Sequence, residues 1–180
     1  MSLFNKAVYN ILCVTRNKKY LEIINKMGNI DNYNIIVPNI YLGNLNCAND
    51  IDFLKNNNIY AIVNCTENEP FNDYFLDKPT FRLCINDSKE EDNINNFKKN
   101  IIEAIEFIDN NVKEGKTVYI HCYWGLMRSA TVTAGYLIMK YKLDYISAIN
   151  LIKEQRPRAL SSIYNFNEVL KSIDEKYNKS

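Results

Sequence analysis

A strand-like run that leads through a cysteine into a helix is the feature that most constrains this chain. Thr117 to Ile120 reads T-V-Y-I, a β-branched and aromatic segment typical of a buried strand. The residues H-C-Y-W-G-L-M-R-S follow directly at 121–129, and an apolar segment with helical character runs from Ala130 to Tyr141. The chain is therefore expected to turn from a strand into a helix within one short loop that carries a thiol.

Such a loop is suited to binding an anion. Backbone N–H groups converge at a helix N-terminus, where the helix dipole adds positive potential. The same field lowers the pKa of a thiol, so Cys122 is expected to be a thiolate at neutral pH. Arg128 offers a fork for two phosphate oxygens, and Gly125 lets the loop turn its N–H groups inward. The alternative, a buried structural thiol, would make the presence of Gly125, Arg128 and Ser129 a coincidence.

The spacing H-C-x2-G-x2-R-S at 121–129 resembles the signature loop of the cysteine-dependent protein phosphatases. Other segments are similar to the dual-specificity branch of that family: I-V-P-N-I-Y-L-G-N at 36–44, A-I-V-N-C-T-E at 61–67, I-N-D at 85–87, and the run from Arg128 through Q-R-P at 155–157. The resemblance covers about residues 33–175. It implies a phosphatase that hydrolyses phosphotyrosine and phosphoserine or phosphothreonine in proteins, with phosphoproteins as partners and with no metal and no cofactor.

Phosphate-ester hydrolysis needs a nucleophile, stabilisation of the phosphate oxygens and a proton for the leaving group. Cys122 is expected to attack phosphorus and form a cysteinyl-phosphate intermediate. Ser129 would donate its hydroxyl to the thiolate, and the resemblance gives His121 a supporting role in the loop rather than that of a base. The residues expected to bind the substrate, through backbone N–H groups and the guanidinium, are Tyr123, Trp124, Gly125, Leu126, Met127 and Arg128.

The expected proton donor is Asp87, because the dual-specificity family places its general acid at this point of the I-N-D segment. The apolar residues from Phe81 to Ile85 predict a strand that ends just before Asp87, and sheet geometry would then fix its side chain. Nearby acidic residues are the alternatives, although they are typical of a solvated loop: Glu90, Glu91 and Asp92.

Cys65 follows a second predicted strand, Tyr60 to Asn64. Some relatives keep a second cysteine at this place, which traps the nucleophile in a reversible disulfide, and a thiol beside a low-pKa thiolate suits redox control. The other interpretation is a core thiol, since free cysteines are commonly buried.

The loop departs from the commonest family pattern at positions 123 and 124. Relatives often carry small or charged residues there, whereas this chain has Tyr123 and Trp124. Two aromatic rings at a pocket rim suit stacking on a phosphotyrosine ring, a peptide side chain or a nucleobase, or they pack against the protein itself. Arg156 and Arg158 flank Pro157. They are expected either to reach a second phosphate or acidic flank of a substrate or to lie at a solvated helix end.

Strands alternate with helices along the chain, so we expect a single α/β domain with a central, mostly parallel sheet of about five strands flanked by helices. Catalysis is then expected at the carboxyl end of the strand at 117–120. The predicted strands are two short ones within 35–42 that join at Pro38-Asn39, then 60–64, 81–85 and 117–120. The predicted helices are 47–58, with Ile51, Phe53 and Leu54 inward, a short one within 66–79, 93–112, which Gly115 stops, and 130–141.

Residues 1–32 precede the phosphatase-like part and are expected to form a helical arm, with residues 33–180 as the catalytic domain. Apolar residues recur here at helical spacing, among them Val8, Ile11 and Leu12. The arm either packs on the domain or forms a homodimer. Poxviral members of the family are dimeric and carry a similar segment, so the poxviral branch is one placement of this chain.

Composition and charge exclude several classes of protein. The hydrophobic fraction of 47% and charged fraction of 24% are those of an ordinary globular chain, and a net charge of +1 favours neither a nucleic-acid partner nor a membrane. No signal peptide or membrane-spanning run is visible. Five cysteines without paired spacing and a single histidine argue against a zinc site. They favour free thiols and therefore the cytosol as the expected compartment, which would be the host cytosol or the virion if the protein is viral.

Two other functions are consistent with the residues. A phosphatase of the same mechanism could act on RNA 5' ends or another non-protein phosphate, although more basic residues around the loop would then be expected. A non-catalytic phosphoprotein-binding module is the other alternative, against which stand the intact Cys122, Arg128 and Asp87.

Overall fold

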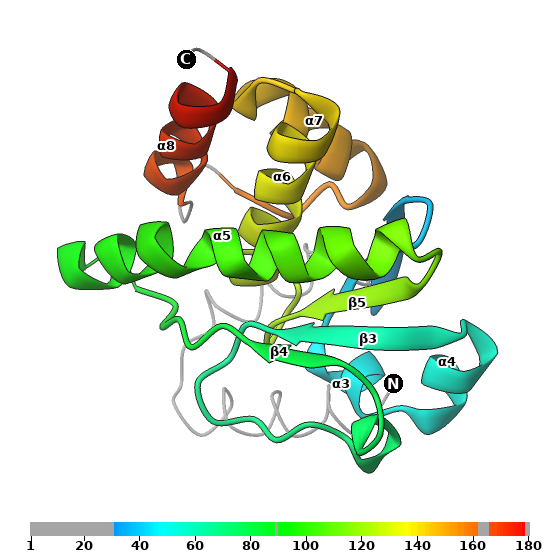
Figure 1. Ribbon diagram of the computed structural model, residues 1–180. Helices are drawn as coiled ribbons and strands as arrows, with labels where there is room; N and C mark the ends of the chain where they lie inside the picture. Colours follow the sequence, from blue (N-terminus) through cyan, green and yellow to red (C-terminus); the bar gives the residue numbers. More distant parts are fainter. Residues whose placement is uncertain (1–30, 89, 162–165, 179–180) are drawn as a thin grey trace, which may run out of the picture. The chain divides into compact units, whose positions relative to one another are not determined.

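A five-stranded sheet lies at the centre of the structure, a computed structural model that describes residues 31–88, 90–161 and 166–178 (Figure 1). The strands are β1 (Tyr33–Val37), β2 (Ile40–Gly43), β3 (Ile59–Asn64), β4 (Thr80–Arg82) and β5 (Thr117–His121). Their order is β1-β2-β5-β3-β4, in which only the β1–β2 pair is antiparallel. The expected single α/β domain with a mostly parallel sheet is therefore confirmed.

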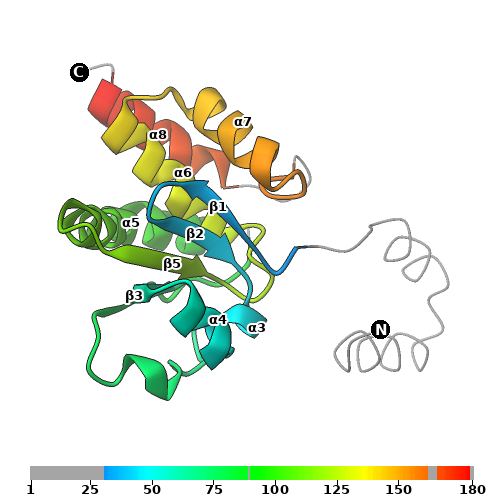
Figure 2. The ribbon, with the colours of Figure 1, turned by 90° about the vertical axis from the view of Figure 1, so that its right-hand side faces the viewer.

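Helices cover both faces of this sheet, as Figure 2 shows. The helical elements are α3 (Leu45–Ala48), α4 (Ile51–Asn56), the 3₁₀ turn η1 (Asp73–Phe75), α5 (Glu91–Lys113), α6 (Arg128–Tyr141), α7 (Tyr145–Gln155) and α8 (Asn167–Asn178). Helices α5 and α6 pack against one face, with α7 and α8 against α6, whereas α3 and α4 lie on the other face. Helices α7 and α8 were not among the predicted elements.

The central strand β5 is buried on both faces because its side chains alternate between two apolar layers. Val118 and Ile120 belong to the layer beneath α5 and α6, and Tyr119 belongs to the layer beneath α3 and α4. The Tyr119 hydroxyl donates to the carbonyl of Asn44 at 2.7 Å, so even the polar atom of this buried ring is paired. Packing from both sides thus fixes the point at which β5 ends and the loop begins.

The single helix predicted over 47–58 is two helices in the structure. Asp50 is extended at φ −94° and ψ 102°, and its side chain accepts a hydrogen bond from the Phe53 N–H at 3.0 Å, which caps the start of α4. Phe53 and Leu54 point inward as expected, but the interpretation of Ile51 as inward is wrong, since it is 45% exposed. The cap rotates the second helix to a new axis, so one helical period does not span both.

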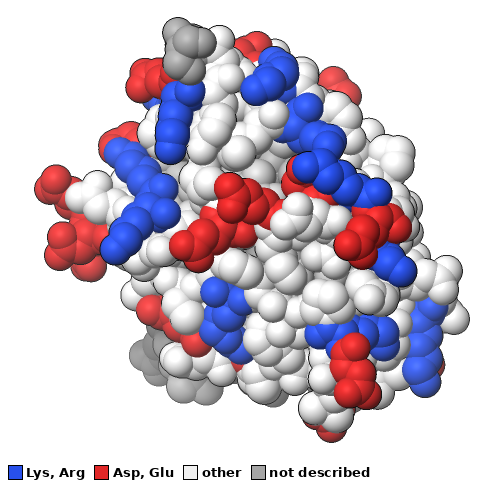
Figure 3. Space-filling model, viewed as in Figure 1, with Lys and Arg blue, Asp and Glu red and all other residues white. Residues whose placement is uncertain are grey.

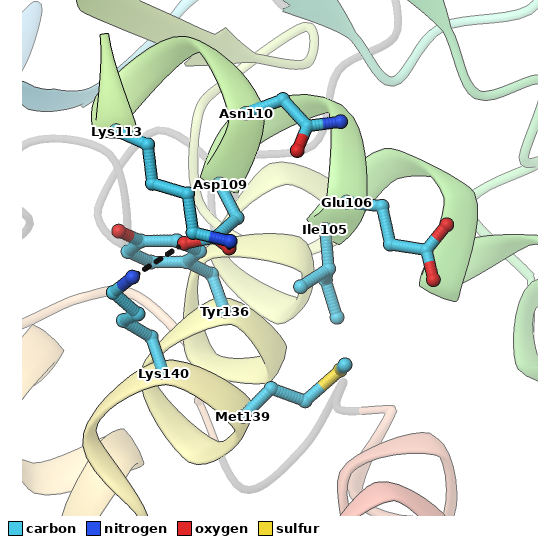
Figure 4. Close-up of a pocket in the computed structure, with 8 residues that line it drawn as sticks. All are labelled: Ile105, Glu106, Asp109, Asn110, Lys113, Tyr136, Met139 and Lys140. Atoms are coloured by element: carbon cyan, nitrogen blue, oxygen red, sulfur yellow. Dashed lines mark ion pairs between the residues drawn. The ribbon is translucent and has the colours of Figure 1, made fainter. Parts of the chain in front are cut away.

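Acidic and basic side chains are interspersed over the face of the molecule that carries α5 (Figure 3). A cleft of about 340 Å³ lies between α5 and α6 on this side (Figure 4). Within it Asp109 pairs with both Lys113 and Lys140, the latter at 2.8 Å. Both ammonium groups thus have a carboxylate partner, and the cleft borders the second half of α6, far along the helix from the signature loop.

The predicted arm over residues 1–32 falls, apart from Asp31 and Asn32, outside the described residues. The arm, the homodimer through it, the likeness to the poxviral branch and the division into an arm and a catalytic domain at 33–180 therefore stay predictions. Within the described part of the chain, no helix is both long and apolar enough to cross a membrane.

Candidate active site

The signature loop joins the buried strand β5 to helix α6 at the carboxyl edge of the sheet. β5 ends at His121 and α6 begins at Arg128, so Cys122 is the first residue of the loop and is only 2% exposed. The N-cap of α6, Met127, makes no side-chain hydrogen bond to the helix N-terminus. The N–H groups of the first turn therefore have no cap to satisfy them, which is the arrangement that favours an anion.

The loop carbonyl groups from Tyr123 to Met127 are each bonded to a partner in another part of the structure or in α6. Tyr123 O accepts from the Leu45 N–H at 3.2 Å, Leu126 O from the Leu160 N–H at 2.9 Å, and Met127 O from Thr131 N–H within α6 at 2.8 Å. The carbonyls of Trp124 and Gly125 accept from a guanidinium described below. Since C=O and N–H of one trans peptide point in opposite directions, these bonds turn the peptide N–H groups away from the carbonyl partners, and the N–H groups of Gly125 and Ser129 bond to Cys122.

That guanidinium belongs to Arg156, which is 2% exposed. Its Nε donates to Gly125 O at 2.8 Å and its Nη2 to Trp124 O at 3.1 Å, while Nη1 donates to Asp31 O at 2.8 Å and to Asn34 Oδ1 at 2.6 Å. The sequence predicted either a substrate contact or a solvated helix end for Arg156. Both interpretations are wrong, because the side chain is buried and its guanidinium bonds to the loop carbonyls. Sequence reasoning missed this role, since no local pattern marks it.

Two glycines meet where the loop crosses the end of β2. Gly125 has a φ of +68°, and a Cβ there would collide with the backbone carbonyl of Gly43. A Cβ on Gly43 would in turn collide with the Tyr119 hydroxyl and the Asn32 carbonyl. The Y-L-G-N segment thus has a physical reason for its glycine: backbone must approach backbone so that the loop can close.

The groups around Cys122 stabilise a thiolate. Burial alone would raise the pKa of Cys122, but the Arg128 charge, the Ser129 hydroxyl and backbone hydrogen bonds from Ser129 and Gly125 together hold that pKa below its usual value. The Ser129 Oγ donates to Sγ at 3.2 Å. Burial lowers the pKa of His121 to about 3, against a hydrogen bond with the Cys122 backbone, so this imidazole is neutral at physiological pH.

Arg128 joins the signature loop to the segment that carries Asp87. Its Nη1 donates to the Ile85 carbonyl at 3.0 Å, and its Nε lies 3.7 Å from Asp87 Oδ2. The Arg128 side chain is 11% exposed and that of Asp87 is 42% exposed, so the carboxylate lies at the mouth of the site. Among the described acidic residues from 87 to 92, only Asp87 has this ion pair; Glu90, Glu91 and Asp92 are exposed at the start of α5.

The expected reason for the position of Asp87 is wrong, however. The strand predicted over 81–85 is β4, which ends already at Arg82, so Asp87 lies in a loop rather than directly at a strand end. Leu83 still donates to the Asn64 carbonyl at 2.9 Å, after which the ladder stops. Sheet geometry therefore does not hold Asp87, and other contacts must.

A family model of the dual specificity phosphatase catalytic domain matches residues 40–176. The chain belongs to this family. Human dual specificity protein phosphatase 9 is 33% identical over 134 residues, which are 73% of this chain and 33% of that protein. Dual specificity protein phosphatase 1B of Arabidopsis thaliana is 29% identical over 126 residues, 69% of this chain and 71% of that protein. The chain thus spans about a third of the length of the human relative.

Solved structures agree with the fold. The crystal structure of human DUSP28 superposes with a TM-score of 0.71 at 21% identity, over 81% of this chain and 94% of that one. For DUSP15 the TM-score is 0.69 at 25% identity, over 82% and 92% of the two chains. At such identities the likeness to DUSP28 speaks for the fold alone.

A second cysteine of this dual-specificity phosphatase domain lies beside the first. Asn64 of β3 pairs with His121 of β5, so the next residues, Cys65 and Cys122, are neighbours, and the Cys65 N–H donates to His121 O at 2.8 Å. Cys65 is fully buried, and burial followed by the charge of Cys122 raises the pKa of its thiol well above the usual value. Both cysteines are free thiols in the structure, and a disulfide between them stays a prediction.

The rim of the phosphatase loop is aromatic. Tyr123 and Trp124 are 39% and 41% exposed, and their rings meet edge to face at 5.3 Å. Leu126 is half-buried and Met127 is buried, so the remaining loop side chains face the protein. Both rings are therefore partly open to solvent at the rim, and stacking on a ligand stays a prediction.

Replacing Ser129 with alanine is expected to move the acidic limb of the kcat/KM pH profile to higher pH. The variant loses the hydroxyl that donates to the thiolate, so the pKa of Cys122 rises and a smaller fraction is ionised at low pH. Rates of iodoacetamide alkylation against pH give the same pKa without turnover. Thr133→Ala is the matched control, because that hydroxyl donates to the Ser129 carbonyl instead. An acidic limb that does not shift in Ser129→Ala would contradict the assignment of the Ser129 hydroxyl as a group that lowers the pKa of Cys122.

Proposed function

We propose that this domain is a metal-independent phosphatase that hydrolyses phosphotyrosine and phosphoserine or phosphothreonine in proteins through a cysteinyl-phosphate intermediate. The observation that carries the proposal is the signature loop itself. The pKa of its Cys122 thiol is lowered, partly by backbone hydrogen bonds from Gly125 and Ser129, and every carbonyl from Tyr123 to Met127 is bonded to another group. The names of the relatives, which are protein phosphatases, support the protein substrates.

In the first step of the proposed reaction, the Cys122 thiolate attacks phosphorus as the bond from phosphorus to the leaving oxygen breaks. The loop N–H groups and the Arg128 guanidinium hold the three non-bridging oxygens. Asp87 gives its proton to the leaving oxygen, which departs as the tyrosine, serine or threonine hydroxyl. The separation of 3.7 Å between Arg128 Nε and Asp87 Oδ2 supports a part for both groups in this step.

In the second step a water molecule attacks phosphorus and the sulfur–phosphorus bond breaks, which releases inorganic phosphate. Asp87, now ionised, accepts the proton of that water, so the carboxyl group returns to its starting state. Ser129 stabilises the departing thiolate through the same hydroxyl that lowers the pKa of Cys122. The Cys122 thiolate is regenerated with no metal and no cofactor in either step.

Phosphate release from a substrate panel tests the proposal. The panel, assayed in chelator and reductant, contains phosphotyrosyl and phosphothreonyl peptides, a phosphoinositide and 5'-triphosphorylated RNA. Turnover of both peptides is expected. Turnover of RNA or lipid alone would keep the mechanism and replace the substrate class, and the net charge of +1 favours the peptides over RNA. No turnover of any substrate would leave a phosphoprotein-binding module.

Replacing Asp87 with alanine is expected to slow substrates with poor leaving groups by about 10²-fold, and activated aryl phosphates much less. A serine or threonine alkoxide needs a proton as it leaves, whereas an activated phenoxide departs without one. Rates for a series of aryl phosphates of rising leaving-group pKa measure this difference. Asp92→Ala, which removes an exposed carboxylate in the first turn of α5, serves as the control. Equal slowing of all esters by Asp87→Ala would place the general acid elsewhere.

A further inference from the structure

The residues on either side of Asp87 are bonded by one side chain of the helix that follows, Asn93. β4 ends at Arg82, and the general acid of the proposed reaction therefore has no strand to fix it. Two carbonyls of this connection are bonded before Asp87 is reached, that of Cys84 by the Asn96 side chain at 3.3 Å and that of Ile85 by Arg128 at 3.0 Å. Neither bond extends to the peptide groups next to Asp87 itself.

Asn93, in the first turn of α5, bonds to the backbone on both sides of Asp87. Its Oδ1 accepts from the Asn86 N–H at 3.1 Å. Its Nδ2 donates to the Asn86 carbonyl and to the Ser88 carbonyl, each at 2.8 Å. One amide side chain thus uses its acceptor and both its donors on the loop, which leaves Asp87 at the apex of a segment tied at its two ends.

These bonds do not serve the helix. The N-cap of α5 is Glu90, which makes no side-chain hydrogen bond to the first turn, and the partners of Asn93 all lie outside α5. Asparagine is also a poor residue for a helix interior, since its side chain competes for backbone groups. The first turn of α5 therefore carries an asparagine whose contacts are with the acid loop.

We propose that Asn93 is a positioning residue for the general acid of this phosphatase: it orders residues 86–88 so that the Asp87 carboxyl group faces the leaving oxygen above Cys122. The inference rests on the proposed function. Asp87 is 42% exposed and its contact with Arg128 is 3.7 Å long, so that pair alone holds the carboxyl group loosely. Displacement of a catalytic group by about 1 Å is enough to lower a rate markedly.

Two variants of Asn93, each with a matched control at Asn95, separate this role from a general effect on folding. Asn93→Ala removes all three bonds, and Asn93→Asp keeps the size and the acceptor but loses both donors. Asn95 is exposed in the same turn of α5 and makes no side-chain hydrogen bond within the described residues, so Asn95→Ala and Asn95→Asp report the loss of an amide and the added charge alone. A carboxylate in a first helical turn stabilises the helix, so Asn93→Asp keeps its fold.

The first readout is the dependence of the rate on the leaving group. Both Asn93 variants are expected to hydrolyse aryl phosphates with poor leaving groups about 10-fold more slowly than the wild-type protein, with activated aryl phosphates nearly unchanged. In the Asp87→Ala background, Asn93→Ala is expected to add no further loss, because the group it positions is gone. Both Asn95 variants are expected to behave as the wild-type protein does.

The second readout does not use activity. Hydrogen exchange of the Asn86 amide is expected to be faster in Asn93→Ala, which removes the acceptor of this N–H, than in Asn93→Asp, which keeps it, with the Cys122 loop amides unchanged in both. Loss that is equal for all leaving groups, or that adds fully to Asp87→Ala, would overturn the positioning role while the proposed function stands. A wild-type protein without phosphatase activity would overturn the proposed function and this inference together.

Discussion

Replacing Cys122 with serine is expected to lower phosphate release by about 10⁴-fold or more while the fold and the binding of oxyanions are kept. Cys122 is the proposed nucleophile, and one of the groups that lower its pKa is the Ser129 hydroxyl, whose Oγ lies 3.2 Å from Sγ. A serine hydroxyl at this place is far harder to ionise than the thiol, so the loop would hold a phosphate that nothing attacks. Tungstate binding by calorimetry measures what is kept, and single-turnover phosphate release measures what is lost.

The control for this variant is Cys84→Ser, which changes an exposed thiol close to the acid loop and leaves Cys122 in place. It is expected to retain full activity. Equal activity in Cys122→Ser and the wild-type protein would contradict the assignment of the nucleophile and, with it, the cysteinyl-phosphate intermediate. Loss of both tungstate binding and turnover would indicate that the serine variant had lost the loop conformation. Cys122→Ala would then be tested in the same way, with tungstate binding kept and turnover lost as the expected result.

Replacing Arg128 with lysine is expected to lower kcat/KM by about 10³-fold for activated and poor leaving groups alike. Lysine keeps the charge but not the planar fork, so it cannot donate to the Ile85 carbonyl and face the phosphate oxygens at once. This equal loss distinguishes Arg128 from Asp87, whose replacement acts on poor leaving groups. Aryl phosphates of graded leaving-group pKa provide the measurement.

Alkylation of Cys122 separates two contributions of Arg128. Its positive charge lowers the pKa of Cys122, and lysine at the same position retains a charge, so the variant is expected to keep a reactive thiolate while it loses turnover. Arg82→Lys is the matched control, because that guanidinium bonds the carbonyls of Thr66 and Glu69 rather than the loop. Near-normal turnover in Arg128→Lys would show that a point charge suffices.

The sequence by itself determined the elements whose patterns are local. Short β-branched and aromatic runs predicted β3 and β5, and the apolar period of 3.6 predicted α5 almost to its ends, with Gly115 at a positive φ of 73° where it stops. The succession of strand, cysteine loop and helix located the candidate site, because each of these signals lies within a few neighbouring residues. Alternation of strands and helices then favoured a parallel sheet.

The sequence was misleading where a local interaction or a missing partner interrupted a pattern. The cap at Asp50 divided one predicted helix into α3 and α4, and β4 stopped at Arg82 although apolar residues continue to Ile85. An apolar residue favours a strand, but a strand also needs a neighbour with which to pair, and the ladder between β3 and β4 ends at Asn64 and Arg82. Apolar pattern alone does not contain that second condition.

Only the tertiary structure decided how the site is held. Arg156 bonds to carbonyls and a side chain that are between 31 and 125 residues away in the chain, and the contact of Gly125 with Gly43 likewise joins distant segments. The bonds of Asn93 to the acid loop span only 5 and 7 residues, yet they depend on where β4 ends and where α5 begins. Most of these contacts join a side chain to the backbone of another segment. Because every residue has a backbone carbonyl, the residue types of the partners give no sign of such contacts in the sequence.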